Sequence, residues 1–170
     1  MGLEWIRRVW RILKDALAGY EALDDKAWEL DVELSQLYYS LRQLYGSFKQ
    51  ALREDKIAKA RELLKEAERN LEKFKKLIDK ARGFNDKARS EWDTIKNRAI
   101  NRILEYEEKM PEDLKGKMHD VYINILFDLE PPLSVFAEYS DHYLSSAEWL
   151  VSHMREEIEI AEEIAKRLGT

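Results

Sequence analysis

The sequence contains no cysteine, which excludes disulfides, thiol nucleophiles and cysteine-ligated zinc or iron–sulfur sites. Glycine (6) and proline (3) are scarce among the 170 residues, so little turn chemistry is available for a β-sheet or a long linker. No segment approaches the ~18 consecutive apolar residues of a membrane span. Near the N-terminus, Arg7, Arg8, Arg11 and Lys14 interrupt the apolar residues, unlike the continuous hydrophobic region of a signal peptide. We therefore expect a cytoplasmic protein with one domain over residues 1–170.

Charged residues are abundant and unevenly distributed. They make up 37% of the chain, against about 25% in an average protein. The net charge of −5 divides into −1 over residues 1–52, +6 over residues 53–102 and −10 over residues 103–170. The basic middle and the acidic C-terminal part could pack together, or each could face a separate partner of opposite sign. Abundant Glu and Lys without cysteine also resemble the composition of thermophile proteins, although long exposed helices give the same signal.

Residues 25–82 carry two apolar stripes with helical spacing. The first consists of Ala27, Leu30, Leu34, Leu37, Leu41, Leu44, Phe48 and Ala51, and the second of Ile57, Ala60, Leu64, Ala67, Leu71, Phe74, Ile78 and Ala81. Steps of three and four residues keep each stripe on one face of a helix. Paired in reverse order, from Ala51 with Ile57 onward, the residue numbers of each pair add to 108. The pattern predicts a long antiparallel helical hairpin that turns at residues 53–56.

Further segments have helical periodicity on both sides of this hairpin. They are residues 3–20, residues from Asn85 or Asp86 to Met110, residues 112–129, and a last helix that follows Pro131–Pro132 and ends at Gly169. Gly19 and a cap at Asp24 are predicted to separate the first two helices, and Gly83 to end the third. Capping-box spacing at Ser145–Glu148 is compatible with a break near residue 145. The sequence therefore predicts an all-α fold, an elongated antiparallel bundle of five or six helices built on the hairpin of residues 25–82.

A basic stripe lies on the third predicted helix, away from its apolar seam. It consists of Arg61, Lys65, Arg69, Lys73, Lys76 and Lys80. Such a row matches the phosphates of a nucleic acid or an acidic protein surface. The alternative is a solvated outer face on which Glu62, Glu72 and Asp79 are intrahelical ion-pair partners. No aromatic row accompanies the stripe, which disfavours the stacking of unpaired bases.

The first predicted helix, residues 3–20, has a wide apolar face and a basic polar face. Trp5 and Trp10, together with several basic residues, resemble an interfacial membrane anchor in composition. The polar face also carries Glu4 and Asp15, and a helical bundle needs a helix of this kind. We therefore expect this helix to pack on the bundle rather than to contact a membrane surface.

Two pairs of acidic residues have spacing that suits a divalent cation. They are Glu105 with Glu108, and Glu138 with Asp141, three residues apart in each pair. The arrangement is distantly similar to the ExxE…ExxD pattern of the all-α MazG-type nucleotide pyrophosphohydrolases, which implies magnesium-dependent nucleotide hydrolysis. Unlike that pattern, this sequence has a separate helix and three prolines between the two pairs.

The last predicted helix has a polar and aromatic side opposite its apolar seam. This side carries Glu138, His142, Trp149, His153 and Glu156. Glu138 and His142 have a usable metal-ligand spacing, but neither histidine has the preceding glutamate of the diiron bundle motif. Trp149 on this side indicates a second packing surface, for another helix of the chain or for a partner. Tyr38, Tyr45 and Leu52, spaced by seven residues, similarly form a second apolar stripe on the hairpin.

These patterns favour a non-enzymatic helical scaffold or protein–protein interaction subunit, with Trp149 on a candidate interaction surface. Its partner would be another protein or a second copy of the chain. The first alternative is a nucleic-acid-binding accessory subunit that uses the basic stripe, and the second is the magnesium-dependent pyrophosphohydrolase. We identify no catalytic residue or metal ligand set in the sequence and expect no cofactor.

Overall fold

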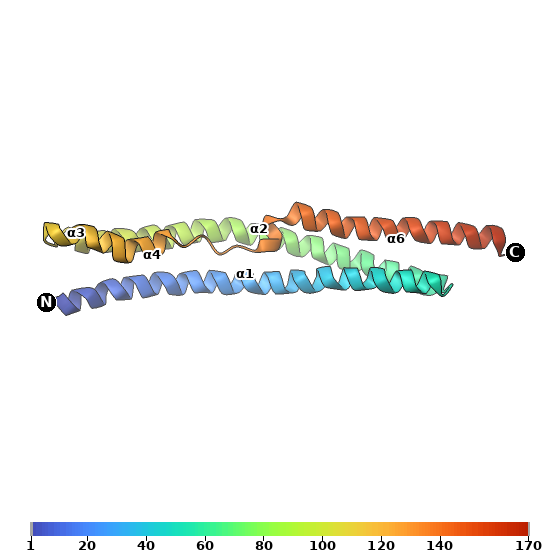
Figure 1. Cartoon of the computed structure of the whole chain (residues 1–170), viewed down its shortest axis with the longest axis horizontal. Helices are drawn as coiled ribbons and strands as arrows, with labels where there is room; N and C mark the ends of the chain where they lie inside the picture. Colours follow the sequence, from blue (N-terminus) through green and yellow to red (C-terminus); the bar gives the residue numbers. More distant parts are fainter. Residues whose placement is uncertain (1, 170) are drawn as a thin grey trace. The chain divides into compact units, whose positions relative to one another are not determined.

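The computed structural model describes residues 2–169, including the side chains of all of them except Leu3 and Met118. Leu3, at the start of the first predicted helix, therefore has a side chain outside the described set. Within residues 2–169 the regular structure is helical and contains no β-strand (Figure 1). The all-α fold class is confirmed.

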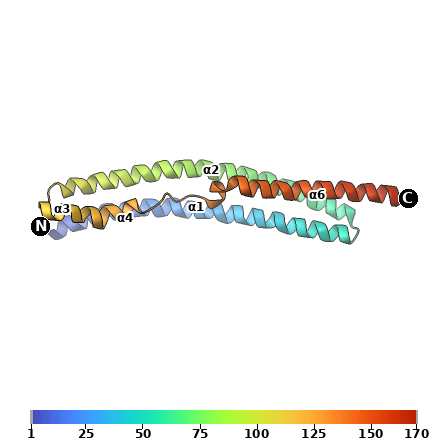
Figure 2. The same cartoon turned by 45° about the horizontal axis from the view of Figure 1, so that its top comes forward.

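Two long helices form the predicted hairpin. Helix α1 spans Gly2–Arg53 and α2 spans Ile57–Glu107, and the two run antiparallel (Figures 1 and 2). In the turn between them, Asp55 has a left-handed φ of 60° and the Lys56 N–H donates to the Ala51 carbonyl at 2.8 Å. The hairpin and the position of its turn are therefore confirmed.

Both helices continue through the predicted breaks, so the division of each into two helices was wrong. Gly19 and Gly83 are helical, because α1 and α2 bury apolar side chains on either side of them, such as Leu23 and Phe84. A glycine inside a helix costs only about 1 kcal/mol relative to alanine, which such packing outweighs. At Gly19 a small residue is also needed, since an added Cβ would lie 3.0 Å from Ile95 Cδ1.

Contacts divide the chain into two compact units, each with its own core. Unit 1 comprises Met1–Trp28 and Gly83–Leu133, and unit 2 comprises Glu29–Arg82 and Ser134–Thr170. Each unit contains a part of α1 and a part of α2 together with one C-terminal segment. The prediction of a single domain over residues 1–170 stays a prediction.

Unit 1 packs three short helices onto the first half of α1 and the second half of α2. These are α3 (Glu112–Met118), the π-helix η1 (His119–Ile123) and α4 (Asn124–Phe127), so the predicted helix over 112–129 is divided by a π-helical turn. The core centres on Trp92, which is fully buried and contacts the Tyr20 ring edge-on at 5.0 Å. Its indole N–H donates to the Leu129 carbonyl at 3.2 Å, which fixes the chain after α4.

Unit 2 combines the hairpin turn region with α5 (Val135–Glu138) and α6 (Ser140–Leu168). Helix α6 runs without a break through residue 145, and the interruption lies instead at Tyr139. Asp31 on α1 anchors the start of α5, because Ser134 Oγ donates to its carboxylate at 2.6 Å and the Val135 N–H at 3.0 Å. Most predicted seam residues of the hairpin are buried in this unit. The predicted seam of α6 is buried only in its first part, at Ala147, Val151, Met154 and Ile158. Its last two members, Ala165 and Leu168, are exposed.

Ion pairs join α6 to α2 along this unit. Arg61 pairs with Glu162, Lys75 with Glu148 at 3.7 Å, Arg82 with Asp141 at 3.5 Å, and Glu68 with Arg155 at 3.5 Å. Three of these four pairs join a basic residue of the middle of the chain to an acidic residue of the C-terminal part. The basic and acidic regions therefore neutralise each other in part within unit 2.

Candidate functional site

The most prominent exposed aromatic cluster of unit 2 lies where α6 faces α1. Trp149 on α6 is 57% exposed, and its ring stacks on His153 with 4.8 Å between centroids and 11° between planes. Tyr45 on α1 contacts both rings, at 6.2 Å from Trp149 and 6.1 Å from His153. Two rings thus flank Trp149 while much of its surface remains in contact with solvent.

A groove of about 400 Å³ borders this cluster between the two helices. Its lining consists of Tyr38 and Arg42 from α1 and of Ser145, Ser146, Trp149 and Leu150 from α6. The Tyr38 ring contacts Tyr143 edge-on at 5.5 Å and lies 5.9 Å from Phe74, so the floor of the groove is fixed by core packing. The groove therefore combines apolar rings with hydroxyl groups and one guanidinium.

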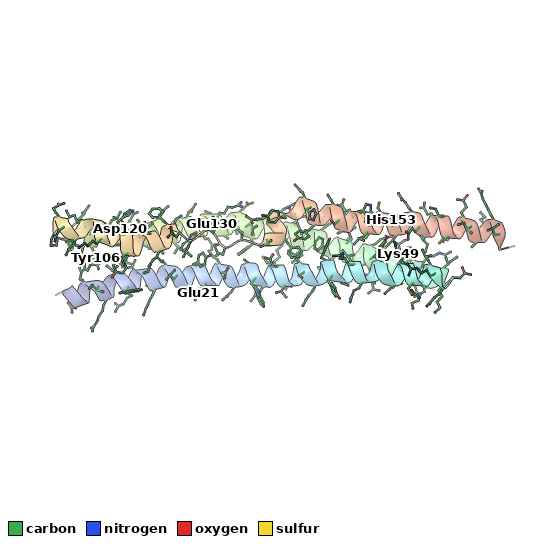
Figure 3. All side chains as sticks on the ribbon, viewed as in Figure 1. Glu21, Lys49, Tyr106, Asp120, Glu130 and His153 are labelled. Carbon is green, nitrogen blue, oxygen red and sulfur yellow. The ribbon has the colours of Figure 1, made fainter. Side chains whose placement is uncertain are left out.

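Charges on the two sides of the groove differ. On α1, Lys49 Nζ lies 4.7 Å from the centre of the Tyr45 ring, and its hydrogen bond with Tyr45 raises the pKa of Lys49. On α6, His153 Nε2 lies 3.0 Å from Glu157 Oε1. Figure 3 shows Lys49 and His153 on these two helices. Arg42 lines the groove from α1, and Lys49 lies beyond it on the same helix, beside Tyr45. The groove and its border therefore carry two cations on the α1 side.

The basic stripe of the sequence is found on the exposed side of α2. All six of its members are exposed, and Arg61 pairs with Glu162 of α6. The acidic residues between them contact other bases: Glu68 pairs with Arg155, Glu72 with Lys75 and Asp79 with Arg82. The remaining members are Lys65, Arg69, Lys73, Lys76 and Lys80, and no ion pair to them is found among the described residues. The interpretation as a solvated face expects Glu72 and Asp79 to pair with residues of the stripe. In the structure they pair with Lys75 and Arg82 instead.

The structure assembles no metal site from the predicted acidic pairs. Glu105 and Glu108 belong to unit 1, whereas Glu138 and Asp141 belong to unit 2, where Asp141 pairs with Arg82. Within the described part of the chain, no three His, Asp or Glu side chains are grouped so that they could hold a metal ion. The resemblance to the pyrophosphohydrolases gains no support from this arrangement.

Glu138 and His142, which were expected on one side of a single helix, belong to two helices. Glu138 closes α5, and Tyr139 interrupts the helix before His142 in α6. His153, the other histidine of that side, instead stacks on Trp149.

The first predicted helix packs on unit 1, as expected. Val9 and Leu13 are fully buried, and the Trp5 ring contacts Tyr106 edge-on at 5.8 Å (Tyr106 is labelled in Figure 3). Trp10 contacts Tyr122 of η1 in the same way at 5.7 Å. Both tryptophans thus serve as packing groups of this unit.

The sequence pattern indicated Trp149 and His153 on one side of a helix, but it did not indicate which residues of α1 lie beside them. The spacing of Tyr38, Tyr45 and Leu52 predicted a second apolar stripe on the hairpin, and the structure places Tyr45 of this stripe beside Trp149. The contribution of Lys49 and Arg42 was not foreseen, because single basic residues on a helix give no signal. Arg42, Tyr45 and Lys49 are spaced by three and four residues and share one side of α1. This spacing is the sequence signal that could have indicated Arg42 and Lys49 beside Tyr45.

Comparison with known proteins gives no further guidance. No protein-family model, curated protein or solved structure matches the chain. In the part of the chain that the structure describes, no helix has an apolar stretch sufficient to cross a bilayer. The function is therefore argued from the surfaces described above.

Proposed function

We propose that the chain is a non-enzymatic helical interaction module that binds a partner protein at the groove around Trp149. The observation that supports it is the orientation of this exposed tryptophan, which is stacked on His153 and flanked by Tyr45. Tryptophan, tyrosine and arginine are the residues that most often dominate protein interfaces, and an ordered side chain loses little entropy on binding.

The shape and charge of the groove define the partner. The groove lies between two helices, which suits an extended helix of the partner more than a compact ligand. Arg42 and Lys49 on the α1 side favour acidic residues there, while Trp149 and Leu150 favour an apolar stripe. The proposed partner segment is therefore an amphipathic helix with apolar residues at steps of three and four and acidic residues along one edge.

Helical peptides test this proposal directly. A displayed library of peptides of about 20 residues, long enough for five helical turns, would be selected against the full chain. Enriched peptides are expected to carry the apolar and acidic pattern described above. Their dissociation constants would then be measured for the wild type and for the variants Trp149→Ala and Arg42→Glu, each of which should weaken binding about tenfold or more.

Trp28→Ala is the matched control, because Trp28 is also an exposed tryptophan of a helix and belongs to unit 1. It should leave peptide binding unchanged, and circular dichroism should give the same helix content for all variants. Peptides that bind Trp149→Ala as tightly as the wild type would contradict the proposed site.

Nucleic-acid binding through the basic stripe is the second candidate function. It is favoured by the absence of ion pairs to Lys65, Arg69, Lys73, Lys76 and Lys80 among the described residues. These five residues span about 22 Å of the exposed side of α2 at 1.5 Å per residue. A row of cations of this length can neutralise several backbone phosphates.

A titration with duplex DNA and duplex RNA at two salt concentrations tests this candidate. Binding should weaken steeply with salt, and a variant with Lys65, Arg69, Lys73 and Lys76 changed to Glu should lose it. The matched control is the exposed cation Lys117, changed to Glu in unit 1. No binding at low salt, or equal binding by the stripe variant, would remove nucleic acid as a partner.

A further inference from the structure

The last turns of α6 carry an apolar stripe that unit 2 leaves exposed. Helix α6 continues past the turn between α1 and α2 (Figures 1 and 2). There, Ile160 is 57% exposed, Ile164 52% and Leu168 82%. Their spacing of four residues places them along one side of the helix.

The side of α6 that carries this exposed stripe contacts α1 closer to the N-terminus of α6. Leu150 lines the groove toward α1, and the charge of Glu157 acts on Lys49 of α1. Leu150, Glu157 and Ile164 are spaced by seven residues and share one side of α6. Because α1 ends at Arg53, this side of α6 has no helix of unit 2 to cover Ile164 and Leu168.

The order of charges in the same segment indicates what covers it. Beside the stripe, Glu163 comes first and Arg167 follows one turn later, and the two side chains pair with each other at 2.7 Å. Glu162 faces α2 instead, where it pairs with Arg61. Two such segments packed antiparallel bring Glu163 of each beside Arg167 of the other, so that the two intrahelical pairs can join, whereas parallel packing would bring like charges together. The segment is thus complementary to itself in one orientation.

We infer that the α6 segment 159–168 is a self-association surface whose partner is the same segment of a second copy, packed antiparallel about Ile164. In this register Ile160 lies opposite Leu168 of the second copy, and Arg167 lies beside Glu163 of the second copy. The contact is isologous, so both copies bury the same residues. The inference rests on the proposed function as an interaction module, but it uses a different surface from the Trp149 groove.

The size of the surface sets the strength that we expect. Three aliphatic side chains per copy bury much less than the ~800 Å² per partner of a standard interface. The association should therefore be weak and concentration-dependent. Because the flanking charges are exposed, it should weaken further when salt is added.

Sedimentation velocity over a concentration series is the test. The wild type is expected to form dimers in a concentration-dependent manner up to on the order of 1 mM, the range in which weak complexes become populated. Leu168→Ser should raise the dissociation constant about tenfold, since an apolar contact at each end of the interface is lost. Glu91→Lys, an exposed acidic residue of unit 1 that the interface does not use, should have no effect.

A charge exchange makes the orientation testable. In a homodimer of Glu163→Lys, positive charges of the two copies would face each other along the interface. In a homodimer of Arg167→Glu, negative charges would do so. Because like charges repel, each variant alone should be monomeric. Mixed together, the two variants should form a heterodimer, which native mass spectrometry can identify from the masses. Circular dichroism is expected to show equal helix content for both variants.

The outcomes separate this inference from the proposed function. A wild type that stays monomeric throughout, or a dimer unaffected by Leu168→Ser and the charge variants, overturns the self-association surface. If peptide binding still depends on Trp149 in that case, the interaction module remains. A dimer without any Trp149-dependent binding would support this surface and overturn the proposed groove.

Discussion

Asp31 illustrates how one side chain joins distant parts of the sequence. Its carboxylate accepts hydrogen bonds from Ser134 Oγ and from the Val135 N–H, about a hundred residues further along the chain. Ser134 in turn accepts from the Ala137 N–H at 3.2 Å and caps α5. The entry into α5 and α6 therefore depends on one carboxylate of α1.

Asp31→Ala should lower the free energy of unfolding by about 1–2 kcal/mol, because Ser134 and the α5 N-terminus lose their acceptor. Asp31→Asn, which keeps one acceptor oxygen, should lower it by less. Urea unfolding followed by circular dichroism measures both. Glu33→Ala, an exposed position of the same helix, should stay within about 0.5 kcal/mol of the wild type. Equal urea midpoints for Asp31→Ala and Glu33→Ala would refute the role of Asp31.

Trp92→Phe should destabilise the chain by about 1–3 kcal/mol, since the part-buried Leu129 carbonyl loses the indole donor and the core loses volume. The measurement is again the free energy of unfolding in urea. Trp28→Phe is the control at an exposed position, where a change within about 0.5 kcal/mol is expected. A loss at Trp92 no larger than at Trp28 would contradict this account of the unit 1 core.

At the residue scale, the periodicity of apolar residues predicted which side chains are buried, but it did not predict the hydrogen-bond partners of individual side chains. Leu34, Phe48 and Phe74 were expected on the apolar seam of the hairpin, and all three are buried. The Trp92 bond to Leu129 was not foreseen, because its acceptor lies in an irregular segment whose path no local pattern determines. Asp31 gave no signal for the same reason, since its partners are far away in the sequence.

At the scale of the elements, glycine was a poor indicator of where a helix ends. Gly19 and Gly83 were predicted to end helices, and both lie inside them. Local signals compete with packing on both sides of a possible break, and sequence alone does not show which of the two prevails. Proline was the better guide: α2 ends at Glu107, shortly before Pro111, which precedes α3.

Gly83→Ala distinguishes the two interpretations of α2. In the continuous helix an alanine Cβ at this position meets no atom within 4 Å, so the variant should be more stable by about 0.5–1 kcal/mol. Gly19→Ala should gain less, because its Cβ would lie 3.0 Å from Ile95 Cδ1. Thermal and urea unfolding measure both. A destabilised Gly83→Ala would instead indicate the left-handed helix end that the sequence predicted.

At the scale of the whole molecule, the sequence indicated the class of fold and the uneven charge but not the use of its surfaces. The net charges of +6 and −10 left two explanations open, and Arg61, Lys75 and Arg82 now have acidic partners on α6. The groove could not be derived from either helix alone, since Tyr45 and Trp149 meet only once α6 packs on the hairpin.

We propose above that this protein works by binding another protein at Trp149. The most direct measurement is quantitative affinity enrichment from native cells with the wild type, Trp149→Ala and Trp28→Ala, followed by mass-spectrometric identification and repetition with the purified partner. We expect a partner that binds the wild type and Trp28→Ala equally well, both from the cells and in purified form. Trp149→Ala should bind this partner at least about tenfold more weakly. A purified partner that binds Trp149→Ala as tightly as the wild type would contradict it.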